Sequence, residues 1–125
     1  MSGFQCLLVV ILVAAPLSAR ADEDIPKGEG VFQNRCSECH AVKGDTVKIG
    51  PPLTGVFGRT SGTWPGYAYS DAMKAANIVW GQETLGQYLK NPRGMVPNTK
   101  MNFNGLKRAG EEEALIAYLE AATRE

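Results

Sequence analysis

A long irregular stretch in the middle of the chain is the feature that most limits how this sequence can fold. Residues 44–69 contain six glycines and three prolines and show neither helical nor strand periodicity. A structureless loop of this length is uncommon inside a compact domain. A second irregular stretch covers residues 92–105. Both stretches carry apolar side chains that need a surface to pack against: Leu53, Val56, Phe57, Trp64, Met95, Val96, Met101 and Phe103.

Helical periodicity is confined to four segments, and no segment alternates as a strand does, so the expected fold class is all-α. The segments are residues 22–35, 70–76, 82–90 and a C-terminal helix that opens with the three glutamates at 111–113. This last helix has the clearest apolar stripe, at positions 115, 118, 119 and 122. In a chain of 125 residues these helices offer little core of their own. A large apolar prosthetic group would supply the missing surface.

The segment Cys36-Ser37-Glu38-Cys39-His40 has the pattern C-x-x-C-H, which is typical of c-type haem attachment. Two thiols at this spacing can each add to one haem vinyl group as thioethers, and the adjacent histidine is then directed at the iron. A redox disulfide would need a βαβ context, and no strands are expected. A zinc site would need about four ligands, and the chain has one histidine and one further cysteine near its N-terminus. We therefore expect one covalently attached haem c per chain.

The second axial position of the iron is not decided by the motif. His40 is the only histidine of the chain, so bis-histidine ligation within one molecule is excluded. The remaining possibilities are a methionine, a lysine, an open site or a small exogenous ligand. Three methionines follow the N-terminal region, at Met73, Met95 and Met101. Met73 falls in a short helical segment and the other two in the second irregular stretch, and composition alone does not separate them.

Residues 1–21 have the pattern of a secretory signal peptide. Their apolar run is shorter than the about 20 residues that a membrane span requires, and it is followed by an A-x-A cleavage pattern at residues 19–21. We therefore expect cleavage before Asp22, export to the periplasm and a single mature domain of residues 22–125. An uncleaved membrane anchor is the alternative, because the first five residues contain no lysine or arginine.

Several segments of the chain match a known family in the family's order. They are C-S-E-C-H at 36–40, G-P-P-L-T-G-V-F-G-R at 50–59, P-G-Y-A-Y-S-D-A at 65–72, Y-L-K-N-P at 88–92, P-N-T-K-M-N-F at 97–103 and L-I-A-Y-L at 115–119. In these segments the chain resembles class I c-type cytochromes, especially mitochondrial cytochrome c and bacterial cytochrome c2. The resemblance implies the small cytochrome c fold, in which three main helices, short helices and long loops surround one covalent haem.

The resemblance also assigns residues around the haem. Met101 falls where the family has its sulfur ligand to the iron, opposite His40. The Pro51 carbonyl would accept the second ring N–H of the histidine, a contact that orients a ligating imidazole. Arg59, Tyr69 and Trp80 would surround the haem propionates, Tyr88 and Thr99 would lie near the methionine ligand, and Gly28 and Phe32 would pack across Leu115 and Tyr118. Met73 departs from the family, which often has a polar residue at that position.

A His/Met pair raises the potential of a haem and leaves no open coordination site, which favours a soluble one-electron carrier over an enzyme. The resemblance implies a cytochrome bc1-type donor and, as acceptor, a terminal oxidase or a photosynthetic reaction centre. It places six basic residues around the exposed haem edge as a docking set: Arg35, Lys48, Arg93, Lys100, Lys107 and Arg108. The 13 basic and 13 acidic residues balance, so nucleic acid is not an expected partner, and we expect a monomer. The alternative function is a haem peroxidase or gas sensor with a labile sixth ligand.

Overall fold

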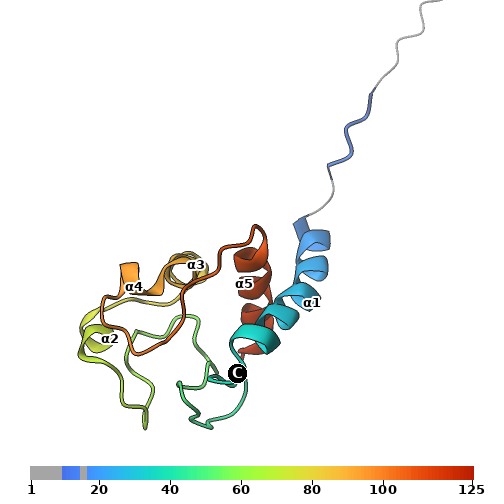
Figure 1. Ribbon diagram of the computed structural model, residues 1–125. Helices are drawn as coiled ribbons and strands as arrows, with labels where there is room; N and C mark the ends of the chain where they lie inside the picture. The colour runs from blue at the N-terminus through green and yellow to red at the C-terminus, as the bar shows by residue number, and fades with distance from the viewer. Residues whose placement is uncertain (1–9, 15–16) are drawn as a thin grey trace, which may run out of the picture.

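The computed structural model describes residues 10–14 and 17–125, and residues 1–9 and 15–16 of the predicted signal peptide lie outside them. The described residues form five helices and one isolated bridge between Thr60 and Val79. The helices are α1 (Leu17–Arg35), α2 (Asp71–Ala75), α3 (Gln82–Lys90), α4 (Pro92–Met95) and α5 (Glu111–Ala122). The expected all-α fold, with three longer helices, short helices and long loops, is confirmed (Figure 1).

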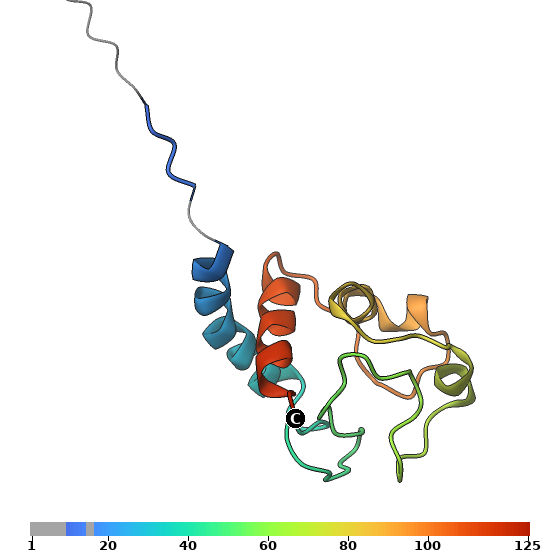
Figure 2. The same ribbon diagram turned by 180° about the vertical axis from the view of Figure 1, so that it is seen from behind.

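Helices α1 and α5 lie side by side and cross at one side of the molecule (Figures 1 and 2). The crossing is close because α1 has a glycine at the contact. A Cβ atom added to Gly28 would lie 1.9 Å from the carbonyl oxygen of Ala114, which no side chain tolerates. One turn further along, the rings of Phe32 and Tyr118 pack with centroids 5.6 Å apart. The contact that the resemblance implied between the first and last helices is therefore present.

Helix α1 begins at Leu17, five residues before the predicted start at Asp22. Pro26 therefore lies in the interior of this helix, where proline removes a backbone hydrogen bond and is normally avoided. Before the helix, the four apolar side chains at 10–13 are 78–89% exposed. Within the part of the chain that the structure describes, no helix has the length and apolar character needed to cross a membrane.

One residue both ends α3 and starts α4. Asn91 is the C-cap of α3, and its side-chain oxygen accepts a hydrogen bond from the backbone N–H of Gly94 at 3.1 Å. Pro92 then occupies the first position of α4, where its missing N–H costs nothing. The sequence predicted the end of α3 at this point, but it treated residues 92–105 as wholly irregular. A helix of four residues is too short to show a 3.6-residue period, so α4 was missed.

The first irregular stretch, residues 44–69, is ordered by backbone hydrogen bonds to a segment further along the chain rather than by regular local structure. Backbone hydrogen bonds join Gly58 N–H to the Trp80 carbonyl at 2.7 Å and Trp80 N–H to the Arg59 carbonyl at 2.9 Å. A third bond joins Ser61 N–H to the Ile78 carbonyl at 2.7 Å. The middle of the first irregular stretch is thus held against residues 78–80, the segment that precedes α3.

Candidate functional site

The helices and the two irregular stretches enclose one large apolar cavity. Its empty volume is about 1360 Å³, including the space at its open mouth. Its walls are mostly aliphatic and aromatic, and they include Phe32, Leu53, Val56, Trp80, Leu85, Tyr88, Leu89, Leu115 and Leu119. Most of these side chains also belong to the core of the molecule. The apolar side chains of the helices and of the irregular stretches therefore line the cavity instead of packing fully against each other.

The two cysteines of the C-x-x-C-H motif line this cavity. The motif continues directly from the C-terminus of α1: Cys36 N–H donates to the Phe32 carbonyl at 2.8 Å, and His40 N–H donates to the Cys36 carbonyl at 2.9 Å. This turn directs both thiols and the imidazole to one side. Cys36 and Cys39 are not joined by a disulfide. Burial raises the pKa of the Cys36 thiol to about 11, and the charge of Arg35 opposes this shift.

His40 also lines the cavity, and a backbone carbonyl fixes the orientation of its ring. Its Nδ1 lies 2.7 Å from the Pro51 carbonyl oxygen, which accepts the proton of this nitrogen. Burial lowers the pKa of His40 from its ordinary value, the Pro51 carbonyl opposes this, and the charges of Lys48 and Arg59 lower the pKa further. A neutral imidazole with its proton on Nδ1 leaves the Nε2 lone pair available to a metal.

Two of the three candidate methionines line the cavity. Met101 and Met73 are both lining residues, whereas Met95 is outside the lining and packs, partly buried, against the core. The segment just before Met101 is anchored by a hydrogen bond of 2.9 Å between the Thr99 and Tyr88 hydroxyl groups. Tyr88 is itself buried and lines the cavity, which raises the pKa of its hydroxyl.

The residues assigned to the propionate side lie together on the cavity wall. The Arg59 guanidinium donates to the carbonyl oxygens of Thr54 at 3.0 Å and Pro52 at 3.2 Å, and it stacks over the Trp64 ring at 5.0 Å. The Tyr69 hydroxyl accepts the Trp64 backbone N–H at 3.1 Å. Burial lowers the pKa of Arg59, but a guanidinium remains charged at neutral pH. The cavity therefore has a fixed positive charge in its wall, which suits a carboxylate-bearing ligand.

Sequence reasoning missed one aromatic residue of this wall. Tyr67 lines the cavity and packs edge-to-face with Tyr69, with ring centroids 4.7 Å apart. Both tyrosines lie in a segment without regular secondary structure. Tyr67 falls within P-G-Y-A-Y-S-D-A at 65–72, one of the segments that carry the family resemblance, and this was the signal that could have identified it.

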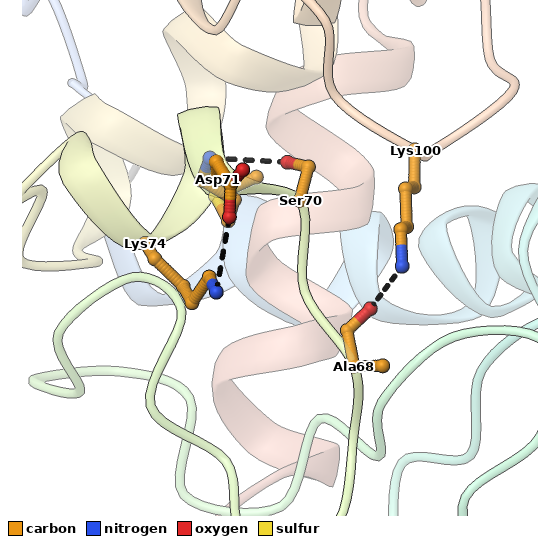
Figure 3. A network of polar contacts seen from close by, with 6 residues as sticks. Ala68, Ser70, Asp71, Lys74 and Lys100 are labelled. Carbon is orange, nitrogen blue, oxygen red and sulfur yellow. Dashed lines mark hydrogen bonds and ion pairs between the residues drawn. The ribbon is translucent and has the colours of Figure 1, made fainter.

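The two irregular stretches are tied together beside Met101. Lys100 donates a hydrogen bond of 2.5 Å to the Ala68 carbonyl (Figure 3). The Ala68 segment is itself fixed two residues later, where the Ser70 hydroxyl accepts the backbone N–H of Met73 and caps α2. The same figure shows the ion pair of Asp71 and Lys74, at 3.1 Å, on the exposed side of this helix.

The six residues of the predicted docking set are all exposed. Several are also engaged by the protein itself. The Arg35 guanidinium lies 5.2 Å from the Phe103 ring centroid, and Lys107 donates to the Lys90 carbonyl at 3.2 Å. Lys48 donates to the Ser37 carbonyl. Arg93 donates to two asparagine side chains, and this contact is developed below.

The donor set of the cavity fits a covalently held haem. Two thiols, one imidazole with a free Nε2 and the thioethers of Met73 and Met101 line its apolar walls, and Arg59 supplies a positive charge that could pair with the carboxylates of a haem. Among residues 10–14 and 17–125, no group of three or more His, Cys, Asp and Glu side chains is placed to hold a metal ion.

Comparisons with known proteins identify the family. The family model described as "Cytochrome c" matches residues 25–123. The chain is 50% identical to a cytochrome c of Sesamum indicum over 101 residues, covering 80% of this chain and 91% of that protein. It is 48% identical to a cytochrome c of Gibberella zeae over 105 residues, covering 83% and 99%. It is 50% identical to a cytochrome c of Chlamydomonas reinhardtii over 101 residues, covering 80% and 90%.

The protein is thus a small haem protein of the class I c-type cytochromes. The chain belongs to the cytochrome c family, and it carries one covalently attached c-type haem. Its general role is that of an electron carrier.

Proposed function

We propose that this protein is a one-electron carrier whose haem is held by thioethers to Cys36 and Cys39, with His40 and Met101 as axial ligands. The observation that carries this proposal is that all four side chains line one apolar cavity. When bound, the haem supplies a ferric–ferrous couple. The chain supplies the setting: the Pro51 carbonyl orients His40, and the apolar walls exclude water. Since both axial positions are taken by side chains, no site is left for a substrate, which favours a carrier over an enzyme.

Met101 is favoured over Met73 as the sulfur ligand for two reasons. The family resemblance places a ligand at Met101, and the adjacent Thr99–Tyr88 hydrogen bond holds this segment against the cavity wall. Met73 instead belongs to α2, where it is 9% exposed and packs with the core. A soft thioether stabilises ferrous iron and raises the reduction potential.

Optical and redox titration of Met101→Ala tests this assignment. The wild-type ferric protein should be low-spin and show the weak far-red band of sulfur–iron ligation. Met101→Ala should lose this band, lower the potential and gain peroxidase activity, whereas Met95→Leu should retain the wild-type spectrum. If Met73→Leu abolishes the band and Met101→Ala does not, the ligand is Met73. A high-spin wild-type protein that binds cyanide readily would instead indicate a peroxidase or gas sensor.

We propose further that the carrier receives electrons from a cytochrome bc1-type complex and passes them to a terminal oxidase or a photosynthetic reaction centre. The six exposed basic residues of the docking set support this proposal, because charge complementarity sets the orientation and on-rate of brief encounters. Electron-transfer rates to an acidic partner should fall as ionic strength rises. Lys107→Glu should slow transfer at low salt more than Lys27→Glu, which changes an exposed lysine of α1 outside the set. Rates that are indifferent to salt would contradict docking through this face.

We propose that residues 1–21 are a cleaved leader and that the mature carrier, residues 22–125, works as a monomer in the periplasm. Two observations support a boundary here. The family match begins at residue 25, and a helix that began near Asp22 would place Pro26 close to its first turn, where proline is tolerated. N-terminal sequencing of the protein from a periplasmic fraction should begin at Asp22. An intact Met1, or recovery in the membrane fraction, would contradict the proposal.

A further inference from the structure

We propose that Arg93, Asn102 and Asn104 form a clamp that holds the Met101 segment closed over the cavity. The Arg93 guanidinium donates through Nη1 to the Asn104 side-chain oxygen at 2.6 Å and through Nη2 to the Asn102 side-chain oxygen at 2.9 Å. One of these asparagines directly follows Met101 in the chain. Arg93 is therefore a positioning residue for Met101, and this role rests on the proposed ligation by Met101.

Helix α4 is built in a way that fixes where Arg93 points. The Asn91 side chain caps its first turn, and the buried Pro92 restricts the backbone just before Arg93. The next residue, Gly94, has no room for a side chain, because an added Cβ would lie 2.1 Å from the Asn91 side-chain nitrogen. Although the helix is short, Asn91, Pro92 and Gly94 together restrict the backbone on both sides of Arg93.

The clamp acts on residues 102–104, which follow Met101. Within them Phe103 also packs, partly buried, against the core, and its ring centroid lies 5.2 Å from the Arg35 guanidinium. The segment is anchored before Met101 by the Thr99–Tyr88 hydrogen bond and after it by Leu106 N–H, which donates to the Leu89 carbonyl at 2.8 Å. Between these anchors, Lys100 bonds the Ala68 carbonyl on one side (Figure 3). The arginine fork holds the residues on the other side of Met101. Loss of the fork should therefore release this segment locally without unfolding the helices.

An arginine is required for this geometry. The planar guanidinium presents several N–H donors in a fixed fork, so it can bond two acceptors at once in one orientation. A lysine keeps the positive charge but provides a single flexible ammonium group. Arg93→Lys therefore separates the clamp from docking, because the surface charge that a partner meets is unchanged. Both hydrogen bonds are exposed to solvent, so their effect on the segment is moderate.

The test is the rate at which cyanide binds to the ferric, haem-loaded protein at saturating cyanide, where opening of the Met101 segment limits binding. We expect Arg93→Lys to raise this rate about threefold to tenfold, from the loss of charge-assisted hydrogen bonds at an exposed site. The double variant Asn102→Ala, Asn104→Ala should raise it by a similar factor. Combining all three changes should add little, since they remove the same contacts.

Matched controls make the same substitutions elsewhere. Arg124→Lys, after α5, and Asn34→Ala, on the exposed side of α1, should leave the cyanide rate unchanged. Hydrogen exchange of the backbone amides at 100–105 should accelerate in the clamp variants only, while the guanidinium unfolding midpoint moves little. A purely structural role for Arg93 would instead shift the unfolding midpoint and leave local exchange unchanged.

The outcomes separate this inference from the proposed ligation. If Met101→Ala binds cyanide no faster than wild type, Met101 is not the ligand, and the clamp has no ligand to position. If Met101→Ala binds cyanide rapidly but Arg93→Lys matches wild type, the ligation stands and the clamp is overturned. Independent, additive effects of the arginine and asparagine changes would also overturn it, because a shared contact requires coupling.

Discussion

Replacing Gly28 by alanine should separate the two helices whose crossing organises the molecule. The added Cβ would lie 1.9 Å from the Ala114 carbonyl oxygen and 2.7 Å from the Tyr118 Cβ. Real Cβ contacts are essentially never shorter than 3.0 Å, and the first of these neighbours is a backbone atom of α5, which cannot rotate away. The helices must therefore move apart by more than an ångström, and the ring contact of Phe32 with Tyr118 must loosen.

The net effect is a difference between two opposing terms. Alanine gains about 1 kcal/mol over glycine in a helix interior, while overpacking a tight contact costs about 1–3 kcal/mol and sometimes more. A clash with backbone belongs at the upper end of that range. We therefore expect Gly28→Ala to lower the free energy of unfolding by about 2 kcal/mol, which lowers Tm by about 8–16 °C in a domain of this size.

Gly30, two residues along the same helix, provides the control. It is exposed, and an added Cβ would meet no atom within 4 Å. Gly30→Ala should therefore raise the free energy of unfolding by about 0.5–1 kcal/mol, through helix propensity alone. Guanidinium unfolding of both variants, followed by circular dichroism, measures the difference. If Gly28→Ala were as stable as Gly30→Ala, the close approach of α1 and α5 would not be what stabilises this fold.

Three further predictions follow from the same reasoning. Gly50→Ala would place a Cβ 2.5 Å from the His40 Cε1 atom, so it should lower stability by about 1–3 kcal/mol and reduce the yield of haem-loaded protein; a normal yield would contradict this. Tyr88→Phe removes the hydrogen-bond partner of the Thr99 hydroxyl and should lower the free energy of unfolding by about 0.5–1.5 kcal/mol. Thermal unfolding measures this change, and an unchanged free energy of unfolding would show that the bond is dispensable. Pro26→Ala should raise the free energy of unfolding of the uncleaved chain, in which Pro26 is interior to α1. The gain should be smaller in the chain cut before residue 22. Equal gains in the two forms would show that the interior position of Pro26 is not the cause.

The chemistry of the site was the part that the sequence could predict best. Two cysteines and a histidine at fixed spacing specify a haem attachment locally, and the structure then places Cys36, Cys39 and His40 on one cavity wall. Helices α3 and α5 also begin and end as their apolar periods and flanking residues indicate. Such features depend on residues within a few positions of each other, so they can be recognised without knowing the fold.

The sequence alone determined where α3 and α5 lie, which residues can attach a haem and that one histidine must serve the iron. Only the tertiary structure decided how the irregular stretches are ordered, through the bonds between residues 58–61 and 78–80. It also decided that Met95 packs away from the cavity, and that Arg93 reaches across from α4 to two asparagines. These contacts join residues far apart along the chain or on opposite sides of a turn. No local pattern encodes them, because they exist only after the chain has closed around the cavity.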